Sequence, residues 1–275
     1  MQDKILYFLY KTLPGRLVLK LLIQPPVSRL AGRLLDSRIS TVLIKPFIRL
    51  NNIDLDEYED RTYLSYNDFF TRKVKPGRRS FEATPDVLCS PCDSKLSIYD
   101  ITDKSRFKIK NTTYSLEQLL KSKKAAAHYQ GGRLMIFRLT VDDYHRYAFV
   151  DDGTLGKTRR IDGVFHTVMP IAGDSYPVYH ENTREYSILK SENFGNILMM
   201  EVGALLVGRI VNNFKSYSGL KIRRGQEKGR FEFGGSTVIL IFEPGKIIID
   251  KDILDAATNG RECIIKQGQR IGQKA

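Results

Sequence analysis

The sequence predicts an α+β protein that is mostly β, with amphipathic helices at the N-terminus and a strand-rich domain after them. From about residue 85 onward, apolar and β-branched runs such as Asn196–Val202 and Thr237–Phe242 alternate with turn residues, which is typical of strands. The first fifty residues instead carry aliphatic side chains with bases spaced among them, broken at Pro14-Gly15 and Pro25-Pro26. Strands this frequent, with few long helices between them, argue against a doubly wound parallel sheet.

We expect two regions, a helical and basic segment at residues 1–60 and the main domain at residues 61–275. Residues 3–50 should form three or four short helices. A capping pattern at Ser65 predicts a further helix, and the capping box that begins at Ser115 predicts a short helix over Leu116–Lys121. The strands that follow are near-continuous apolar runs, so both of their faces should be buried. These runs include Arg133–Val141, Asn196–Val202, Leu205–Asn212, Thr237–Phe242 and Lys246–Ile249.

Two turns near the C-terminus share the pattern G-Q-x-x-G, one starting at Gly225 and the other at Gly268. Paired turns of this kind resemble those of biotinyl and lipoyl carrier domains, which are flattened sandwiches of short strands. The carrier lysine of those domains is absent here. The pattern therefore predicts a barrel-sandwich shape for the strand-rich domain, and not a carrier function.

The net charge of +13 at pH 7 implies an anionic partner. In residues 1–50 the only acids are Asp3 and Asp36, and the bases are interleaved with aliphatic residues. Such a pattern suits amphipathic helices on an anionic lipid surface, where each base contributes about 1 kcal/mol. The alternative is a helical cap that packs on the protein's own core, and both can hold together. The bases are Lys4, Lys11, Arg16, Lys20, Arg29, Arg33, Arg38, Lys45 and Arg49.

No apolar run approaches the roughly 20 residues that span a bilayer, since Leu17–Ile23 is interrupted by Lys20. The segment also lacks the features of a signal peptide. Three cysteines give no disulfide framework, and Cys89-x-x-Cys92 with Cys263 falls short of the four ligands of a structural zinc site. We therefore expect a peripheral protein at the cytoplasmic face of the cell membrane, without a metal.

The most informative segment is Phe233-Gly234-Gly235-Ser236-Thr237, a tight glycine turn that delivers a serine to the start of a buried strand. Glycines allow a strained backbone, and a strained Gly-Ser peptide is where a serine hydroxyl can attack the carbonyl before it. The alternative is an ordinary β-turn. A motif this short needs support from the rest of the chain.

Several further segments, in order along the chain, supply that support, and together with F-G-G-S-T they resemble the phosphatidylserine decarboxylase family. The resemblance spans residues 67 to 272. Its segments are Asn67-Asp68-Phe69-Phe70-Thr71-Arg72-Lys73 with Lys75-Pro76-Gly77, Ser90-Pro91-Cys92-Asp93, Asp143-Tyr144-His145-Arg146, Glu192-Asn193-Phe194-Gly195, Glu201–Gly208 and Arg224–Gly229.

The resemblance implies a self-processing zymogen that cuts itself between Gly235 and Ser236. The products would be a larger β chain, residues 1–235, and a smaller α chain, residues 236–275, which stay associated. Ser236 would become a covalent pyruvoyl cofactor, whose ketone forms a Schiff base with the amine of phosphatidylserine. Loss of CO2 would then give phosphatidylethanolamine. The implied partners are phosphatidylserine, anionic membrane lipids and the cleaved small chain.

The resemblance also implies catalytic roles. Asp93 matches the carboxylate that orients the base for Ser236, and His145 matches a histidine that contacts the substrate and takes part in decarboxylation. Without the resemblance, Asp93 reads as a turn aspartate and His145 as a packed histidine.

The chain departs from the family pattern where a second histidine, commonly the base for self-cleavage, is replaced by Ala148. His166, one expected hairpin later, is the nearest substitute, because a neighbouring strand could bring its imidazole to the same pocket. The alternative for His166 is a structural sheet histidine.

The basic loop Arg72–Arg79, and Arg72 and Lys73 in particular, is expected to receive the lipid phosphate. The alternative is a solvated charged loop. The sequence leaves the oligomeric state open, a homo-oligomer included.

Three other functions compete. A catalytically silent relative would bind anionic lipid and never mature, and Ala148 motivates it. A nucleic-acid-binding module would explain the charge, but the chain has none of the usual motifs, so we expect no nucleic acid. A pyruvoyl enzyme that acts on another amino acid or phosphoserine lipid also fits.

Overall fold

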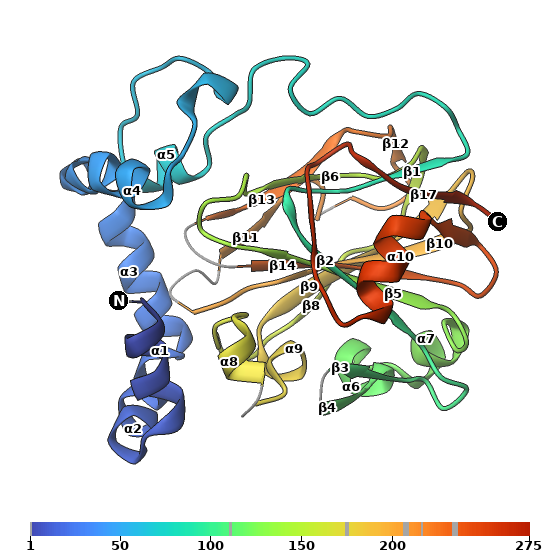
Figure 1. Ribbon diagram of the computed structural model, residues 1–275, viewed down its shortest axis with the longest axis horizontal. Helices are drawn as coiled ribbons and strands as arrows, with labels where there is room; N and C mark the ends of the chain where they lie inside the picture. The colour runs from blue at the N-terminus through green and yellow to red at the C-terminus, as the bar shows by residue number, and fades with distance from the viewer. Residues whose placement is uncertain (1, 110–111, 174–175, 206–208, 216, 233–235) are drawn as a thin grey trace.

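The computed structural model describes residues 2–109, 112–173, 176–205, 209–215, 217–232 and 236–275. Its first part is helical, as predicted, and these helices gather at one end of the molecule (Figure 1). The prolines expected to break the helices lie in first turns, where a missing N–H costs no hydrogen bond. The elements are α1 (Gln2–Lys11), α2 (Leu13–Leu22), α3 (Pro25–Asp36), α4 (Ile44–Asn51) and α5 (Tyr66–Phe70), with 3-10 turns η1 (Arg38–Leu43) and η2 (Leu55–Glu57).

Both predicted capping patterns are confirmed. The Ser65 hydroxyl accepts a hydrogen bond from the Asp68 amide at 3.1 Å and starts α5. The Ser115 hydroxyl accepts from the Gln118 amide at 3.4 Å and starts α6 (Leu116–Leu120). Each serine thereby satisfies one of the amides that the first turn of a helix leaves without a partner. The remaining helices are α7 (Lys123–His128), α8 (Pro170–Gly173), α9 (Val178–Glu181) and α10 (Lys251–Thr258).

The largest sheet in the described part of the chain has nine antiparallel strands, in the order β12-β7-β9-β10-β14-β5-β2-β16, with β8 also paired to β9. Strand β14 lies near its middle, between β10 and β5. The strands are β2 (Ser94–Asp100), β5 (Arg133–Leu139), β7 (Gly153–Leu155), β8 (Arg159–Ile161), β9 (Arg184–Ser191), β10 (Asn196–Val202), β12 (Lys221–Ile222), β14 (Ser236–Phe242) and β16 (Cys263–Ile265).

Apolar layers cover both faces of this sheet, which explains the near-continuous apolar runs. Alternate residues of β5 and β14 enter two different cores, Phe137 and Val238 in one and Ile136 and Ile239 in the other. The first core is closed by β6 (Arg146–Ala148), β11 (Arg209–Asn212) and β13 (Glu227–Glu232), and the second mainly by helices α1, α2, α6 and α8 (Figure 1).

Two small sheets complete the fold. One pairs β1 (Val87–Cys89), β17 (Arg270–Lys274) and β15 (Ile247–Ile249), and the other pairs β3 (Arg106–Ile109) with β4 (Thr112–Ser115).

The α+β, mostly β class is confirmed, and the expected run Asn196–Val202 coincides with β10. Strand β11 begins only at Arg209, and residues 206–208 of the expected strand lie outside the described residues. The barrel-sandwich character and the division at residue 60 stay predictions.

Candidate active site

Ser236 is the first residue of β14 and lies at the end of a central strand, opposite Leu139 of β5. Its side chain is fully buried, and its hydroxyl has no hydrogen-bond partner among the described residues. A buried hydroxyl without a partner costs free energy, so it calls for an explanation. Gly235, the other half of the expected cleavage site, lies outside the described residues.

The side chain of Ser236 faces the first core. Strand residues two apart share a face, and Val238 belongs to that core. Val238 pairs with Glu201 of β10, so Glu201 lies on the same face, diagonal to Ser236. The space beside Ser236 is therefore shared between the large sheet and the β6-β11-β13 layer.

His145 is held at the same end of the sheet. It follows the turn that leaves β5 after Leu139, and its carbonyl accepts a hydrogen bond from Phe231, five residues before Ser236, at 2.9 Å. The imidazole is fully buried, 4.2 Å from the Phe70 ring between centroids, and its Nδ1 lies 2.9 Å from the Asp143 carbonyl. A carbonyl can only accept, so Nδ1 carries the hydrogen and Nε2 is the basic nitrogen.

Asp143, which precedes Tyr144 and His145, fixes this turn. Its carboxylate accepts from the Thr140 amide at 2.7 Å and pairs with Lys95 Nζ at 2.8 Å. The D-Y-H-R segment thus contributes an acid that shapes the turn and a histidine that the turn presents.

Asp93 is buried and surrounded by cationic and amide donors. Arg79 binds both of its oxygens at 2.8 Å, and the Gln267 amide donates at 2.8 Å. Burial would lower the pKa of Arg79, but its bonds to Asp93 and Glu57 raise it overall. Among the described residues, no hydrogen bond joins Asp93 to a histidine or to Ser236. Its orienting role stays a prediction.

Ala148 shows where the missing histidine would stand. It is buried in β6, and its amide donates to the carbonyl of Pro91, two residues before Asp93, at 2.9 Å. The S-P-C-D segment and the position of the second family histidine therefore lie side by side, as a carboxylate and its histidine partner would require.

His166 lies near the Ser236 end of the sheet, on the side of the second core. Asn182 Nδ2 donates to the carbonyls of His166 and of Gly203, both at 2.8 Å. Gly203 follows Val202, which pairs with Thr237. A single asparagine therefore links the His166 backbone to the strand that flanks Ser236.

The His166 ring itself is enclosed by other partners. Nδ1 lies 3.3 Å from the Tyr10 hydroxyl, Nε2 lies 3.2 Å from Glu181, and the ring stacks on Tyr176 with centroids 4.5 Å apart. Burial lowers the pKa of His166 to about 4 despite the nearby carboxylate, so the imidazole is neutral at neutral pH. No contact between His166 and Ser236 is found among the described residues.

Comparison with known proteins shows the family of this chain. The family model described as Phosphatidylserine decarboxylase matches residues 66–273. The chain belongs to the phosphatidylserine decarboxylase family. The match begins beside the predicted residue 67 and covers Asp93, His145, His166 and Ser236.

Individual relatives extend the similarity over the N-terminal helices. Phosphatidylserine decarboxylase proenzyme 2 of Clostridium acetobutylicum is 47% identical over 269 residues, 98% of this chain and 91% of the relative. The phosphatidylserine decarboxylase proenzyme of Clostridium tetani is 44% identical, covering 90% of this chain and 84% of its own length. That of Ruminiclostridium cellulolyticum is 42% identical, covering 98% and 91%.

The two basic residues predicted to bind the lipid phosphate differ in exposure. Arg72 is fully buried, with its guanidinium carbon 4.2 Å from the Tyr58 ring centroid and 4.9 Å from that of Phe69. A phosphate could reach it only after those rings moved. Lys73 is exposed. Their role in substrate binding stays a prediction for this member of the decarboxylase family.

Sequence reasoning missed a buried polar network next to Ser236. Lys228 of β13 pairs with Glu201 at 2.7 Å, and both side chains are almost wholly inaccessible. Asn212 donates to Glu201 at 2.9 Å and to Glu185 at 3.0 Å, and it accepts from Lys228 at 3.1 Å. The sequence contained one indication of this network, because Glu201 is the one acid within the apolar run of β10.

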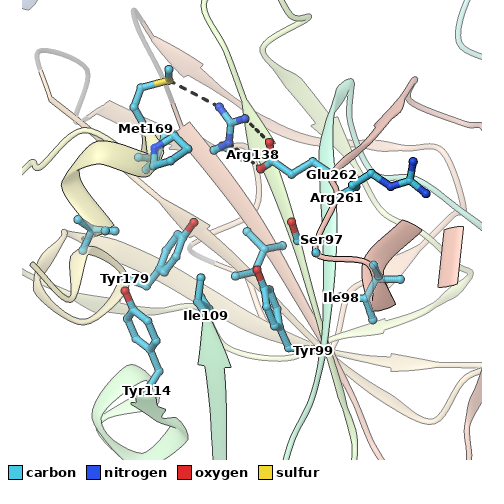
Figure 2. Close-up of a pocket in the computed structure, with 17 residues that line it drawn as sticks. Ser97, Ile98, Tyr99, Ile109, Tyr114, Arg138, Met169, Tyr179, Arg261 and Glu262 are labelled. Atoms are coloured by element: carbon cyan, nitrogen blue, oxygen red, sulfur yellow. Dashed lines mark hydrogen bonds and ion pairs between the residues drawn. The ribbon is translucent and has the colours of Figure 1, made fainter. Parts of the chain in front are cut away.

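A cavity of about 420 Å³ opens on the other face of the sheet, and its lining includes Tyr99 of β2 and Arg138 of β5 (Figure 2). Its wall includes Arg138, whose register partner is Thr237, the residue after Ser236. The cavity therefore extends toward the end of β14 that carries Ser236.

Two features are absent from the residues that the structure describes. None of their helices is both long and apolar enough to cross a bilayer. Their His, Cys, Asp and Glu side chains also form no group of three that could hold a metal ion.

Proposed function

We propose that this protein decarboxylates phosphatidylserine to phosphatidylethanolamine and CO2, at a pyruvoyl group made from its own Ser236. The observation that carries the proposal is the buried hydroxyl of Ser236 at the start of a central strand, which has no hydrogen-bond partner among the described residues. Membership of the decarboxylase family and the name proenzyme borne by its relatives support it.

In the maturation that we propose, Ser236 Oγ attacks the carbonyl carbon of Gly235. The peptide nitrogen leaves as an amine, and an ester replaces the amide. Removal of the α-proton of residue 236 then expels the Gly235 carboxylate and leaves dehydroalanine. Water hydrolyses the imine form of that residue, releasing ammonia and leaving a ketone. The products are chains 1–235 and 236–275.

Once formed, the pyruvoyl ketone supplies an acceptor for the electron pair that CO2 leaves behind. We assign His145 the proton that replaces CO2. Because its Nδ1 donates to the Asp143 carbonyl, Nε2 is the atom that takes up and returns this proton. Enclosure beside Phe70 keeps bulk water from competing with it.

We assign the base for self-cleavage to His166, in place of the histidine that Ala148 replaces. Two observations support this assignment: burial keeps the imidazole neutral at neutral pH, and Asn182 links its backbone to the strand beside Ser236. Ser236 faces the first core and His166 lies on the side of the second, so the imidazole would have to leave Tyr10 and reach the hydroxyl around the start of β14.

We also propose a peripheral location at the cytoplasmic face of the cell membrane, with anionic lipids as partners. Large apolar side chains are exposed on the N-terminal helices beside the bases described above, which supports this placement. They include Ile5, Tyr7, Leu13, Leu17, Leu21, Leu30, Leu34, Ile39, Val42 and Leu50. The three cysteines are free, which fits a reducing compartment.

The test is self-cleavage of the purified protein, followed on a denaturing gel and by intact mass. Wild type should give two chains, the smaller one with a pyruvoyl end, and release CO2 from carboxyl-labelled phosphatidylserine. Ser236→Ala should stay in one piece and be inactive. His166→Ala should mature at least about a hundredfold more slowly, the lower range for loss of a general base. The exposed His128→Ala should mature normally.

A single wild-type chain with an unmodified serine would overturn the proposal and favour the silent lipid-binding relative that Ala148 suggests. Normal maturation of His166→Ala would rule out His166 as the base for self-cleavage and leave the rest of the proposal in place. The rate should also fall as the pH drops through about 4, because a protonated His166 cannot accept a proton.

A further inference from the structure

The cavity on the second face of the sheet has the lining of a lipid-chain site. Figure 2 shows tyrosines and aliphatic side chains around its interior and the Arg138 guanidinium at its wall, while the exposed Arg261 guanidinium extends outward from the rim. A volume of about 420 Å³ lies within the range of small-molecule sites. Its apolar lining is Ile98, Ile109, Ile136, Val168, Met169, Pro170, Val178 and Ala257, with Tyr99, Tyr114 and Tyr179.

The guanidinium groups of Arg138 and Arg261 differ in whether they already have an acidic partner. Arg138 is committed to Glu262, which accepts from its Nε at 2.9 Å and from Nη2 at 2.5 Å. Arg261 is exposed, and no hydrogen bond or ion pair of its guanidinium is found among the described residues. An uncommitted Arg beside an apolar interior matches a molecule with a hydrocarbon chain and an anionic group.

One end of the cavity meets the processing site. Arg138 pairs in register with Thr237, and its Nη1 lies 3.6 Å from Met169 Sδ. Strands in a sheet lie about 4.8 Å apart, so this part of the wall is only one residue and one strand spacing from Ser236. The Ser236 side chain points to the opposite face of the sheet. A ligand whose chain fills the cavity would therefore pass its headgroup around the start of β14 to reach it.

Helix α8 of the cavity wall connects it to the helices that we place on the membrane. Pro170 and Gly173 line the cavity, while Ala172 packs in the second core with Leu6 and Leu9 of α1. On the same helix α1, Ile5 and Tyr7 are exposed. The elements between the cavity and the expected lipid surface are thus in direct contact.

We propose that this cavity binds an acyl chain of the phospholipid substrate, with Arg261 at its rim for the phosphate. The inference rests on the proposed function and deepens it, since it says how a lipid reaches Ser236 from the membrane. It also predicts that the enzyme distinguishes substrates by chain length.

Two variants that fill the cavity test the proposal, Ala257→Phe from α10 and Gly173→Phe from α8. A Cβ at Gly173 would meet no described heavy atom within 4 Å, so this change adds volume without a clash at its base. Thr258→Phe, an exposed neighbour outside the cavity, is the matched control. Self-cleavage of each variant, followed on a gel, reports that it has folded.

For the filled variants we expect KM for a long-chain phosphatidylserine to rise about tenfold or more, because several methylene groups lose their apolar site. KM for dihexanoyl phosphatidylserine should change less than about twofold, and the control should change neither. Equal effects on both substrates, or no effect on either, would overturn the proposal.

A binding measurement separates this inference from the proposed function. Uncleaved Ser236→Ala protein should bind long-chain lysophosphatidylserine in calorimetry, and adding Gly173→Phe or Ala257→Phe should weaken binding about tenfold. Failure of the wild type to cleave itself would refute the proposed chemistry. The binding measurement would still test whether the cavity binds the lipid chain. Unchanged binding in both filled variants would overturn the cavity proposal whatever the chemistry.

Discussion

At the scale of residues, Lys228 and Glu201 form a buried ion pair between the large sheet and the β6-β11-β13 layer. Burial raises the pKa of Glu201, and Lys228 and Asn212 oppose that rise. Such a pair costs desolvation of both ions, so its net contribution to stability is small while the cost of breaking it is large. The pair fixes how two layers meet beside Ser236.

Lys228→Met should lower the free energy of unfolding by about 3–5 kcal/mol, because Glu201 is left as an uncompensated buried charge. Urea unfolding in the uncleaved Ser236→Ala background measures this. Without Lys228 the pKa of Glu201 rises further, and a raised carboxyl pKa destabilises the fold increasingly as pH rises. The deficit should therefore be smaller at pH 5 than at pH 8.

Two companion variants sharpen this prediction. The exposed Lys221→Met should change the free energy of unfolding by less than about 0.5 kcal/mol. The double variant Lys228→Met with Glu201→Leu should recover part of the loss, because no buried charge remains. A loss below about 1 kcal/mol for Lys228→Met alone would contradict the idea that the pair carries an electrostatic penalty.

At the scale of elements, α2 presents an apolar face away from the protein. Leu13, Leu17 and Leu21, four residues apart, are 79%, 67% and 69% exposed. Residues at this spacing share one side of a helix. Leu19, on another side of the same helix, is buried in the second core. One side of α2 therefore packs on the protein, as the cap interpretation predicts, and another side is exposed, as the proposed lipid contact requires.

Leu17→Asp with Leu21→Asp should weaken binding to vesicles that contain anionic lipid by at least about tenfold, since two leucines proposed to enter the lipid are each exchanged for a charge. Vesicle sedimentation measures this. Self-cleavage should stay normal, because neither side chain packs inside the protein.

Salt provides an independent check on the same surface. Binding of the wild type should also weaken as the salt concentration rises, because salt screens the attraction between the basic residues and anionic lipid. Undiminished binding of the double aspartate variant would show that α2 does not contact lipid.

At the scale of the whole molecule, the proposed cut divides the chain without dividing the fold. Strand β14 of the smaller product lies between β10 and β5, and β17 pairs with β1 of the larger product. Asp93 further ties the two products together through the Gln267 amide at 2.8 Å. Both pieces thus contribute strands to the same cores.

The two chains of mature enzyme should therefore elute as one species in gel filtration and separate only in denaturant. Separation is resisted because β14 would expose two apolar faces and two rows of backbone hydrogen bonds. Gel filtration with and without urea, with each peak identified by mass, checks this. Two separate peaks in native buffer would contradict it.

The sequence by itself determined the α+β class, the helical N-terminus, both serine caps and the course of β10. These features depend on neighbours in the chain, through apolar periodicity and hydrogen bonds within one turn. The F-G-G-S-T segment and the ordered motifs likewise pointed to Ser236, His145 and the decarboxylase family before any fold was known.

Only the tertiary structure decided what each side chain meets. It buried Arg72 between rings, enclosed Asp93 with Arg79, turned the His166 ring toward Tyr10, and joined Lys228 to Glu201. It also created the cavity from strands and helices far apart in the chain. Side-chain partners depend on strand register and on how layers pack, and those are fixed by contacts between distant residues that local patterns do not encode.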